Sequence, residues 1–393
     1  MIKKNFLEKD IIYLDNASTT IPYSCDLPDN IWFNASASYT GRAGVKQILN
    51  QCKKDILKIF NIIDNGDVLF TSGATESNNI VVLSFVKQLY DYLLTNGLSK
   101  KYNMIVSPIE HPSVLNIYKE IEKSGIIDVR YMSVDSNGIV VVKKLKKLID
   151  NNTILVSCMY VNNEIGVIQP IAEIGRICFN KNVCFHVDAT QAIGKISIDC
   201  EKDYIDFLTF SAHKFHGPKG MGAVVCNHDS IIELQPLFFG GHQQESLRAG
   251  TENVPDIYIM TEILKDVCNI NNIAESQHFS YIANNLLKGY LENHFNNDEY
   301  IINSNNFKIP IMNISFKNIT GEYLVNELSK YNIYISAGSA CTTGTFENSH
   351  VLEAMKVNSE FIEGTIRISF DPFDIDDKSL MTTVLKIKEI ISK

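Results

Sequence analysis

Short apolar segments alternate with longer amphipathic segments from about residue 60 to residue 226. The short segments predict buried strands, and the segments between them predict helices. The predicted strands are residues 68–71, 104–107, 154–160, 183–188, 207–211 and 222–226, and the predicted helices are residues 79–94, 112–124 and 171–180. This order predicts a mainly parallel sheet with helices on both faces.

A second, shorter alternation follows a loop at residues 238–242. It predicts helix from residue 255 to about 295 with a polar break near 269–272, then strands at 309–316, 333–336 and 365–370, and helices at 321–331 and 378–392. We therefore expect a large domain over residues 15–254. A small domain is expected from residues 1–14 and 255–393, with a mobile loop at about 336–348.

Composition is that of a globular protein. The chain has 393 residues, of which 45% are apolar and 21% charged, and this length favours two domains. The net charge of −9 argues against general nucleic-acid binding. A local cluster of Lys143, Lys144, Lys146 and Lys147 is either a basic patch or, as we favour, a solvated helix face.

Neither a membrane segment nor a disulfide framework is predicted. No apolar run reaches the length needed to span a bilayer, and residues 1–18 do not resemble a signal peptide. The nine cysteines contain no CxxC pair, so neither a disulfide frame nor a zinc site is expected. We expect no membrane partner and a reducing, cytoplasmic location.

Two charged residues follow neighbouring predicted strands. Asp188 ends the strand 183–188, and Lys214 comes just after the strand 207–211. Parallel sheets bind ligands beyond the carboxyl ends of their strands. An amine and a carboxylate placed there suit pyridoxal 5′-phosphate (PLP), because a lysine can bond to its aldehyde while an aspartate keeps its pyridine nitrogen protonated. A strand-end aspartate and a surface lysine remain the alternative.

Other polar segments follow the same strands. Residues 71–79, with Thr75, suit a phosphate cradle at a helix N-terminus, although helix capping alone would also explain them. His111 suits stacking on the pyridine ring and proton transfer, or else caps a helix. Asn163 suits a contact to the cofactor ring hydroxyl or to a substrate carboxylate, or else belongs to a turn.

Further candidates come from the adjoining segments. Gln191 can donate to the ring oxygen, while Ser211 and His213 are close enough in sequence to Lys214 to reach the phosphate. Thr251 can meet the phosphate across a subunit interface. Arg367 offers a guanidinium fork for a substrate carboxylate, with a structural salt bridge as the alternative.

Cys341 lies in a run of small and polar residues, SAGSACTTG at 336–344, which predicts a mobile segment. The other cysteines lie mostly in apolar or helical stretches. An accessible thiol on such a segment suits a nucleophile that travels.

Six segments together resemble the cysteine desulfurases of the NifS/IscS type, which are PLP enzymes of the class-V aminotransferase family. They are TSGATESNN, VNNEIGVIQ, HVDATQAIGK, SAHKFHGPKG, RAGTENVP and SAGSACT, and the resemblance runs from Tyr13 to about Phe370. It implies the α/β fold of PLP-dependent transferases of fold type I (aspartate aminotransferase-like), with a mainly parallel seven-stranded sheet in the large domain.

The resemblance also implies a role for each residue. Lys214 would be the Schiff-base lysine, Asp188 the pyridinium partner, His111 the ring-stacking residue and Cys341 the persulfide carrier. Arg367 would bind the substrate carboxylate, and Asn163 the ring oxygen and the substrate. The remaining cofactor contacts would be Gln191 to the ring oxygen and, in the phosphate shell, Ala74, Thr75, Ser211, His213 and, from a second subunit, Thr251.

The chain departs from the family pattern in places. The segment Asn34-Ala35-Ser36-Ala37-Ser38-Tyr39 replaces the usual Asn-Pro-Ser-Ser segment and is one residue short, and Asn34 is still expected to contact substrate. The chain ends at Lys393, soon after the last predicted helix, so we expect a docking tail for an iron–sulfur scaffold to be absent or altered.

The resulting expectation is a homodimeric cysteine desulfurase that converts L-cysteine to L-alanine and passes sulfur through Cys341 to an acceptor protein. Iron–sulfur scaffold, tRNA thiolation and DNA sulfur modification remain open as destinations. No metal site is expected, apart from transient ligation of an iron–sulfur cluster by Cys341. The alternatives are a selenocysteine lyase or another PLP-dependent C–S lyase, and a non-catalytic sulfur-transfer adaptor.

Overall fold

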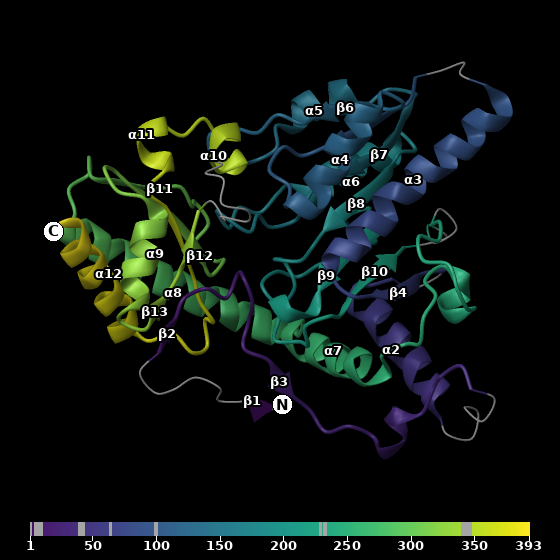
Figure 1. Ribbon diagram of the computed structural model, residues 1–393, viewed down its shortest axis with the longest axis horizontal. Helices are drawn as coiled ribbons and strands as arrows, with labels where there is room; N and C mark the ends of the chain where they lie inside the picture. Colours follow the sequence, from purple (N-terminus) through teal and green to yellow (C-terminus); the bar gives the residue numbers. More distant parts are fainter. Residues whose placement is uncertain are drawn as a thin grey trace.

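The computed structural model describes residues 2–3, 11–37, 44–62, 65–97, 101–227, 230, 234–338 and 348–393. Figure 1 shows a larger α/β part, a smaller α/β part beside it, and long helices running between the two.

A seven-stranded sheet forms the centre of the larger part. Its strand order is β4-β10-β9-β8-β7-β5-β6. The strands are β4 (Asp67–Thr71), β5 (Asn103–Val106), β6 (Asp128–Tyr131), β7 (Thr153–Ser157), β8 (Cys184–Asp188), β9 (Phe207–Ser211) and β10 (Gly222–Cys226). Only β10 runs antiparallel to its neighbours, β4 and β9. The predicted mainly parallel seven-stranded sheet is therefore confirmed.

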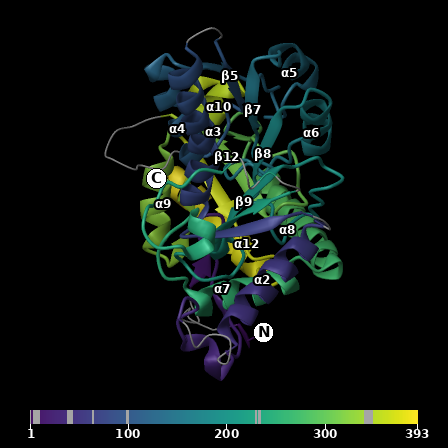
Figure 2. The ribbon, with the colours of Figure 1, turned by 90° about the vertical axis from the view of Figure 1, so that its right-hand side faces the viewer.

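The strands of this sheet send residues into two cores on opposite faces. In β4, Val68 and Phe70 pack on one face, whereas Leu69 packs on the other. Helices α3 (Ala74–Asn96) and α4 (Pro112–Ser124) cover the Leu69 face. Helices α2 (Val45–Ile59), α5 (Val142–Leu148), α6 (Ile171–Asn180) and α7 (Val254–Val267) supply the core of the opposite face. Figure 2 shows the sheet between α3 and α4 on one side and α5 and α6 on the other.

The smaller part contains a four-stranded sheet of order β11-β12-β15-β14. Its strands are β11 (Tyr300–Ile302), β12 (Ile311–Phe316), β14 (Ser336–Ala337) and β15 (Thr365–Ser369). Helices α8 (Ile270–His294), α9 (Gly321–Ser329) and α12 (Asp377–Ile391) pack against this sheet in a second core. The short helix α10 (His350–Ala354) packs on loops of the larger part. The short helix α11 (Ser359–Ile362) adds Ile362 to the same cluster and also contacts β12.

Residues 11–20 join the two parts. Strand β2 (Ile12–Tyr13) pairs with β13 (Ile333–Tyr334), and Leu14 is buried in the smaller core. Ala17, three residues later, is buried in the larger core. A strand β1 (Ile2–Lys3) pairs with β3 (Tyr23–Ser24) at the edge of the molecule.

The predicted domain boundary at 254/255 stays a prediction. Helix α7 begins there, and its buried residues Val254, Ile257 and Met260 belong to the larger core. The later residues of α8, Leu287 and Leu291, are buried in the smaller core. The chain therefore passes from the larger core to the smaller core along α8.

Candidate active site

A cavity of about 830 Å³ lies at the carboxyl ends of the central strands. Its walls come from the segments after β4, β5, β7, β8 and β9, and from β14, β15 and the start of α10. The structure brings together at this cavity most of the residues that the sequence singled out: Ala74, Thr75, His111, Asn163, Asp188, Gln191, Ser211, His213, Lys214 and Arg367.

Lys214 ends a single 3-10 turn, Ala212–Lys214, that directly follows β9. Its Nζ donates to the backbone carbonyls of Ala17 at 2.8 Å and Ser18 at 2.6 Å. Burial lowers the pKa of this amine to about 8, and the positive charge of Arg367 adds to the effect. Roughly a tenth of the amine is therefore neutral at pH 7, which is the form that attacks a carbonyl carbon.

Asp188 ends β8 and is 4% exposed. Its Oδ1 accepts from the backbone amide of Thr190 at 2.9 Å, and its Oδ2 accepts from the side-chain amide of Asn78 at 2.9 Å. Both bonds fix the orientation of the carboxylate. A carboxylate held in this way can keep a protonated ring nitrogen in place.

A buried hydrogen-bond network extends from Asp188 into the sheet. Thr209 donates to Asn78 Oδ1 at 2.5 Å and lies 3.2 Å from Nε2 of His186. Nδ1 of His186 is 3.0 Å from the hydroxyl of Ser157. Burial lowers the pKa of His186 to about 4, so this ring is neutral at pH 7. The network thus holds Asn78 rigidly without adding a second charge.

The phosphate cradle predicted at residues 71–79 is a strand-to-helix junction. Helix α3 begins at Ala74, and Gly73 before it has a φ of +149°. A side chain at Gly73 would be strained by that φ, and its Cβ would lie 3.2 Å from Oγ of Ser211. Backbone amides and the positive end of the helix dipole at this junction suit an anion.

An ion pair between Glu76 and Arg248 fixes the backbone at Ser72, next to the predicted phosphate cradle. Nε of Arg248 donates to Glu76 Oε1 at 2.8 Å, and Oε2 accepts from the Ser72 backbone amide at 2.8 Å. Burial raises the pKa of Glu76, but the bonds from Arg248 and Ser72 outweigh it and lower the pKa below the ordinary value.

His111 caps α4 and also lines the cavity, so the structure combines the two predicted alternatives. Its Nδ1 accepts from the Ser113 backbone amide at 3.1 Å, which places the proton of the neutral ring on Nε2. Burial lowers the pKa of the ring, and Asp188 opposes that shift. A neutral imidazole therefore faces the cavity at pH 7.

Arg367 lies in the middle of β15 and is 8% exposed. The alternative prediction for Arg367, a structural salt bridge, is present: Nη2 donates to Asp15 Oδ1 at 2.9 Å. Nη2 also donates to the Ser18 hydroxyl at 2.8 Å. Nη1 donates to the Asn163 carbonyl at 2.9 Å. Nε is buried and has no partner among the described residues. The guanidinium is thus positioned at the cavity with two of its five N–H donors, one on Nε and one on Nη1, still unused by the described residues.

Gln191 donates through Nε2 to the Ala17 carbonyl at 2.8 Å, while its Oε1 has no partner within the described ranges. Since the amide group carries two hydrogens, one remains for a ring oxygen. His213 lies 3.2 Å from the Thr19 hydroxyl through Nδ1, and burial lowers its pKa to about 4.

Three predicted site residues are not placed at the cavity. Asn34 accepts from the Ser36 amide at 2.8 Å and does not line the cavity, and neither does Thr251, which is exposed. The expected role of Thr251 requires a second subunit. Cys341 lies outside the described residues. Their predicted roles stay predictions.

Sequence reasoning missed several contributors. Asn78 was treated as part of a loop, yet it lies one turn inside α3. Glu110 is 1% exposed, and burial raises the pKa of its carboxyl well above the ordinary value. Glu164 accepts a hydrogen bond from the Ser349 hydroxyl. A polar side chain in an otherwise buried segment was the available signal for Asn78 and Glu110.

These features fit PLP. The junction at Gly73 suits its phosphate, Asp188 its pyridine nitrogen and Lys214 its aldehyde, while His111 is available to its ring. Among the described residues there is no group of three or more His, Cys, Asp or Glu side chains placed to hold a metal ion. Within the same residues no helix is long and apolar enough to cross a membrane.

Comparison with known proteins agrees with the site. Residues 12–376 match the Aminotransferase class-V family. Cysteine desulfurase IscS of Buchnera aphidicola subsp. Acyrthosiphon pisum is 35% identical over 396 residues, which cover 97% of this chain and 93% of that protein. Cysteine desulfurase 2 of Trichormus variabilis is 33% identical over 383 residues, covering 92% and 89%.

A solved structure gives the same result. The structure of a NifS-like protein superposes with a TM-score of 0.82 at 31% identity, covering 97% of this chain and 99% of that one. The chain therefore belongs to the class-V aminotransferase family and, within it, to the cysteine desulfurases of the NifS/IscS type.

Proposed function

We propose that this chain converts L-cysteine to L-alanine with PLP bound at Lys214, and that Cys341 receives the sulfur. The main support is the relation between Lys214 and Asp188, which line one cavity at the ends of adjacent strands. When bound there, PLP would withdraw electrons from the substrate α-carbon.

The residues of the cavity have distinct tasks in this proposal. With PLP and substrate bound, the free Nζ of Lys214 would take the α-proton of the substrate. The lowered pKa of Lys214 suits it to this proton transfer near neutral pH. Asp188 keeps the pyridine nitrogen protonated, and Asn78 holds Asp188.

Arg367 binds the substrate carboxylate. Its unused Nε and its position on a rigid strand support this role. The existing pair with Asp15 places the guanidinium and limits its rotation. Asn163, whose carbonyl accepts from Arg367, contributes its side chain to the same end of the cavity.

Cys341 then attacks the substrate sulfur as a thiolate. A sulfur–sulfur bond forms, the carbon–sulfur bond breaks, and its electron pair stays on carbon, which is protonated to give alanine. His111 carries the proton released by the substrate thiol. The described residues on either side, Gly338 and Asn348, both line the cavity, which supports a route for Cys341 into it.

The acceptor of the sulfur stays open in this proposal, with an iron–sulfur scaffold, a tRNA-thiolating protein and a DNA-modifying protein as the candidate classes. Homodimer formation, with Thr251 supplied to the partner's phosphate cradle, is part of the proposal. Cytoplasmic location is the expectation that accompanies it.

Two variants test the assignment. Lys214→Ala should remove the visible absorbance of the lysine-bound cofactor. If the variant stays yellow after dialysis, Lys214 is not the residue that bonds to PLP.

Cys341→Ser should keep that absorbance but lose sulfide release from cysteine under a reductant, with Cys268→Ser as the control. Undiminished release would place the nucleophile elsewhere. Equal alanine formation from selenocysteine by Cys341→Ser would favour the lyase alternative.

A further inference from the structure

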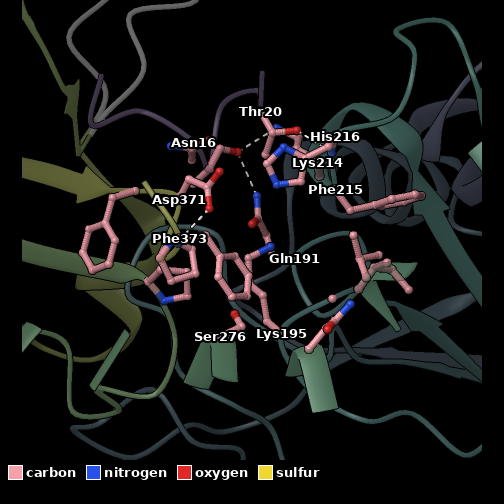
Figure 3. A pocket seen from close by; sticks show the side chains of 18 of the residues that line it. Asn16, Thr20, Gln191, Lys195, Lys214, Phe215, His216, Ser276, Asp371 and Phe373 are labelled. Atoms are coloured by element: carbon pink, nitrogen blue, oxygen red, sulfur yellow. Dashed lines mark hydrogen bonds between the residues drawn. The ribbon is translucent and has the colours of Figure 1, made fainter. Parts of the chain in front are cut away.

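A second pocket lies behind Lys214, between the two parts of the molecule. We call it the interdomain pocket. It has a volume of about 270 Å³ and receives walls from residues 193–195, from α7 and α8, and from residues 370–373. Ala17, Gln191 and Lys214 line both this pocket and the catalytic cavity. Figure 3 shows the side chains around it, with Gln191 near the centre and Lys195 below it.

One side of the interdomain pocket offers hydrogen-bond acceptors. Oδ1 of Asn16 and Oε1 of Gln191 are buried and accept no hydrogen bond in the described part of the chain. The orientation of Gln191 is set, because its Nε2 donates to the Ala17 carbonyl at 2.8 Å. The carboxylate of Asp371, which accepts from the Phe373 amide at 3.0 Å, adds negative charge to the wall. Buried acceptors without donors reduce stability, so this side favours a ligand with N–H groups.

Lys195 supplies the opposite charge. Its Nζ makes no hydrogen bond or ion pair with a described residue, although the side chain lines the pocket. Burial lowers its pKa to about 8 and the charge of Lys214 contributes, whereas Asp371 opposes the shift. The side chain is therefore mostly protonated at pH 7, and a carboxylate is its natural partner.

Apolar side chains fill the rest of the lining. Ile193, Val267, Pro310 and Phe373 all contribute, and the stacked rings of Tyr23 and His216, with centroids 4.1 Å apart, add a flat surface. A bound molecule can place an aliphatic body against these groups.

We propose that the interdomain pocket binds a small α-amino acid as its zwitterion, at a site separate from the catalytic cavity. The ammonium donates to Asn16 and Gln191 on the side of Asp371, and the carboxylate pairs with Lys195. A simple anion would leave the two amide oxygens without donors, and a simple amine would leave Lys195 without a partner. The proposal does not depend on the desulfurase assignment.

The test uses N-methylglycine, L-proline and N-methyl-L-phenylalanine with the intact PLP-bound protein. These secondary amines keep the zwitterion and two N–H donors but cannot form a neutral imine with the cofactor. Titration calorimetry should show saturable binding of at least one of them, with no change in the visible spectrum. Lys195→Met should weaken that binding about tenfold, as expected for loss of a charged hydrogen bond. Lys202→Met, at an exposed lysine, should leave it unchanged.

A second variant keeps the proposal testable if Lys195→Met folds poorly. Asn16→Ala removes one acceptor and should weaken binding of the same probe by a similar factor, while a bare acetate ion should bind far more weakly than N-methylglycine. Absence of saturable binding by all three probes would overturn the proposal. So would equal affinity in the variants, or acetate binding as tightly as N-methylglycine, which would identify a simple anion site.

Discussion

The side-chain amide of Asn78 donates a hydrogen bond to Oδ2 of Asp188 over 2.9 Å, joining the first turns of α3 to the end of β8. Both residues are buried, Asn78 completely. The helix whose N-terminus we propose as the phosphate cradle thus also holds the carboxylate that we propose for the pyridine nitrogen. One element positions both ends of the cofactor site.

Asn78→Ala should therefore weaken PLP binding. Loss of a hydrogen bond to a charged group is worth about 1.5–3 kcal/mol, which corresponds to about a tenfold or larger rise in Kd. The measurement is a spectroscopic titration of cofactor-free protein with PLP. Asn284→Ala is the control, since Asn284 is equally buried but donates to the carbonyls of Phe307 and Ile309, in the segment leading to β12. An equal loss of affinity in both variants would contradict a specific role for Asn78.

Attachment of PLP to the cofactor-free protein should depend on the neutral form of Lys214. Because its pKa is lowered to about 8, the rate should rise with pH and level off above pH 8, rather than continue to rise toward pH 10. Arg367→Met removes a positive charge that lowers this pKa, so its midpoint should move to higher pH. Free PLP titrates in the same way in both assays, so the difference in midpoint between the unchanged protein and Arg367→Met reports on Lys214 alone. Coincident midpoints would contradict the electrostatic influence of Arg367.

Glu76→Gln should reduce stability in a pH-dependent way. The pKa of Glu76 is lowered in the folded protein, so its contribution is present above the unfolded pKa, near 4.5, and is lost as pH falls through the folded value. Urea unfolding at pH 7 should show a loss of about 1–3 kcal/mol that shrinks at pH 4 and below. Glu120→Gln, at an exposed pair with Lys123, should change little at either pH. A loss that stays constant with pH would contradict the argument.

Gly222→Ala should disturb the phosphate cradle through the backbone. A Cβ at Gly222 would lie 2.5 Å from the Phe210 carbonyl oxygen and 2.6 Å from Cα of Gly73, so the strand or the cradle must shift. We expect a lower Tm and weaker binding of PLP and of inorganic phosphate. Gly289→Ala is the matched control, because its Cβ meets nothing within 4 Å in helix α8 and should preserve or raise Tm. Normal phosphate affinity in Gly222→Ala would contradict the close packing.

The arrangement of the sheet could be predicted because the strand signals are local. β8 was predicted one residue longer than observed, and α4 and α6 have the predicted bounds. Since parallel strands end at one edge, predicting the strands also predicted that Asp188, Lys214 and His111 would meet.

Other parts of the site depend on contacts that no local pattern reveals. Arg367 pairs with Asp15, 352 positions away in sequence. Helix α3 was predicted to begin at 79 but begins at Ala74, since Thr-Glu-Ser-Asn-Asn is typical of loops and only tertiary packing keeps it helical. The predicted contacts of Thr251 concern a second chain, which a single sequence does not position.

The acceptors of the Lys214 amine belong to the segment that joins the two parts. Asn16 and Ala17 bond to Ser369 in the smaller part, whereas Thr20 bonds to His213 in the larger part. A rotation of one part against the other must therefore stretch or shorten the bonds from Nζ to the Ala17 and Ser18 carbonyls. Any such movement would therefore act on the hydrogen bonds of this lysine, and so on its nucleophilicity, without a ligand touching that side chain.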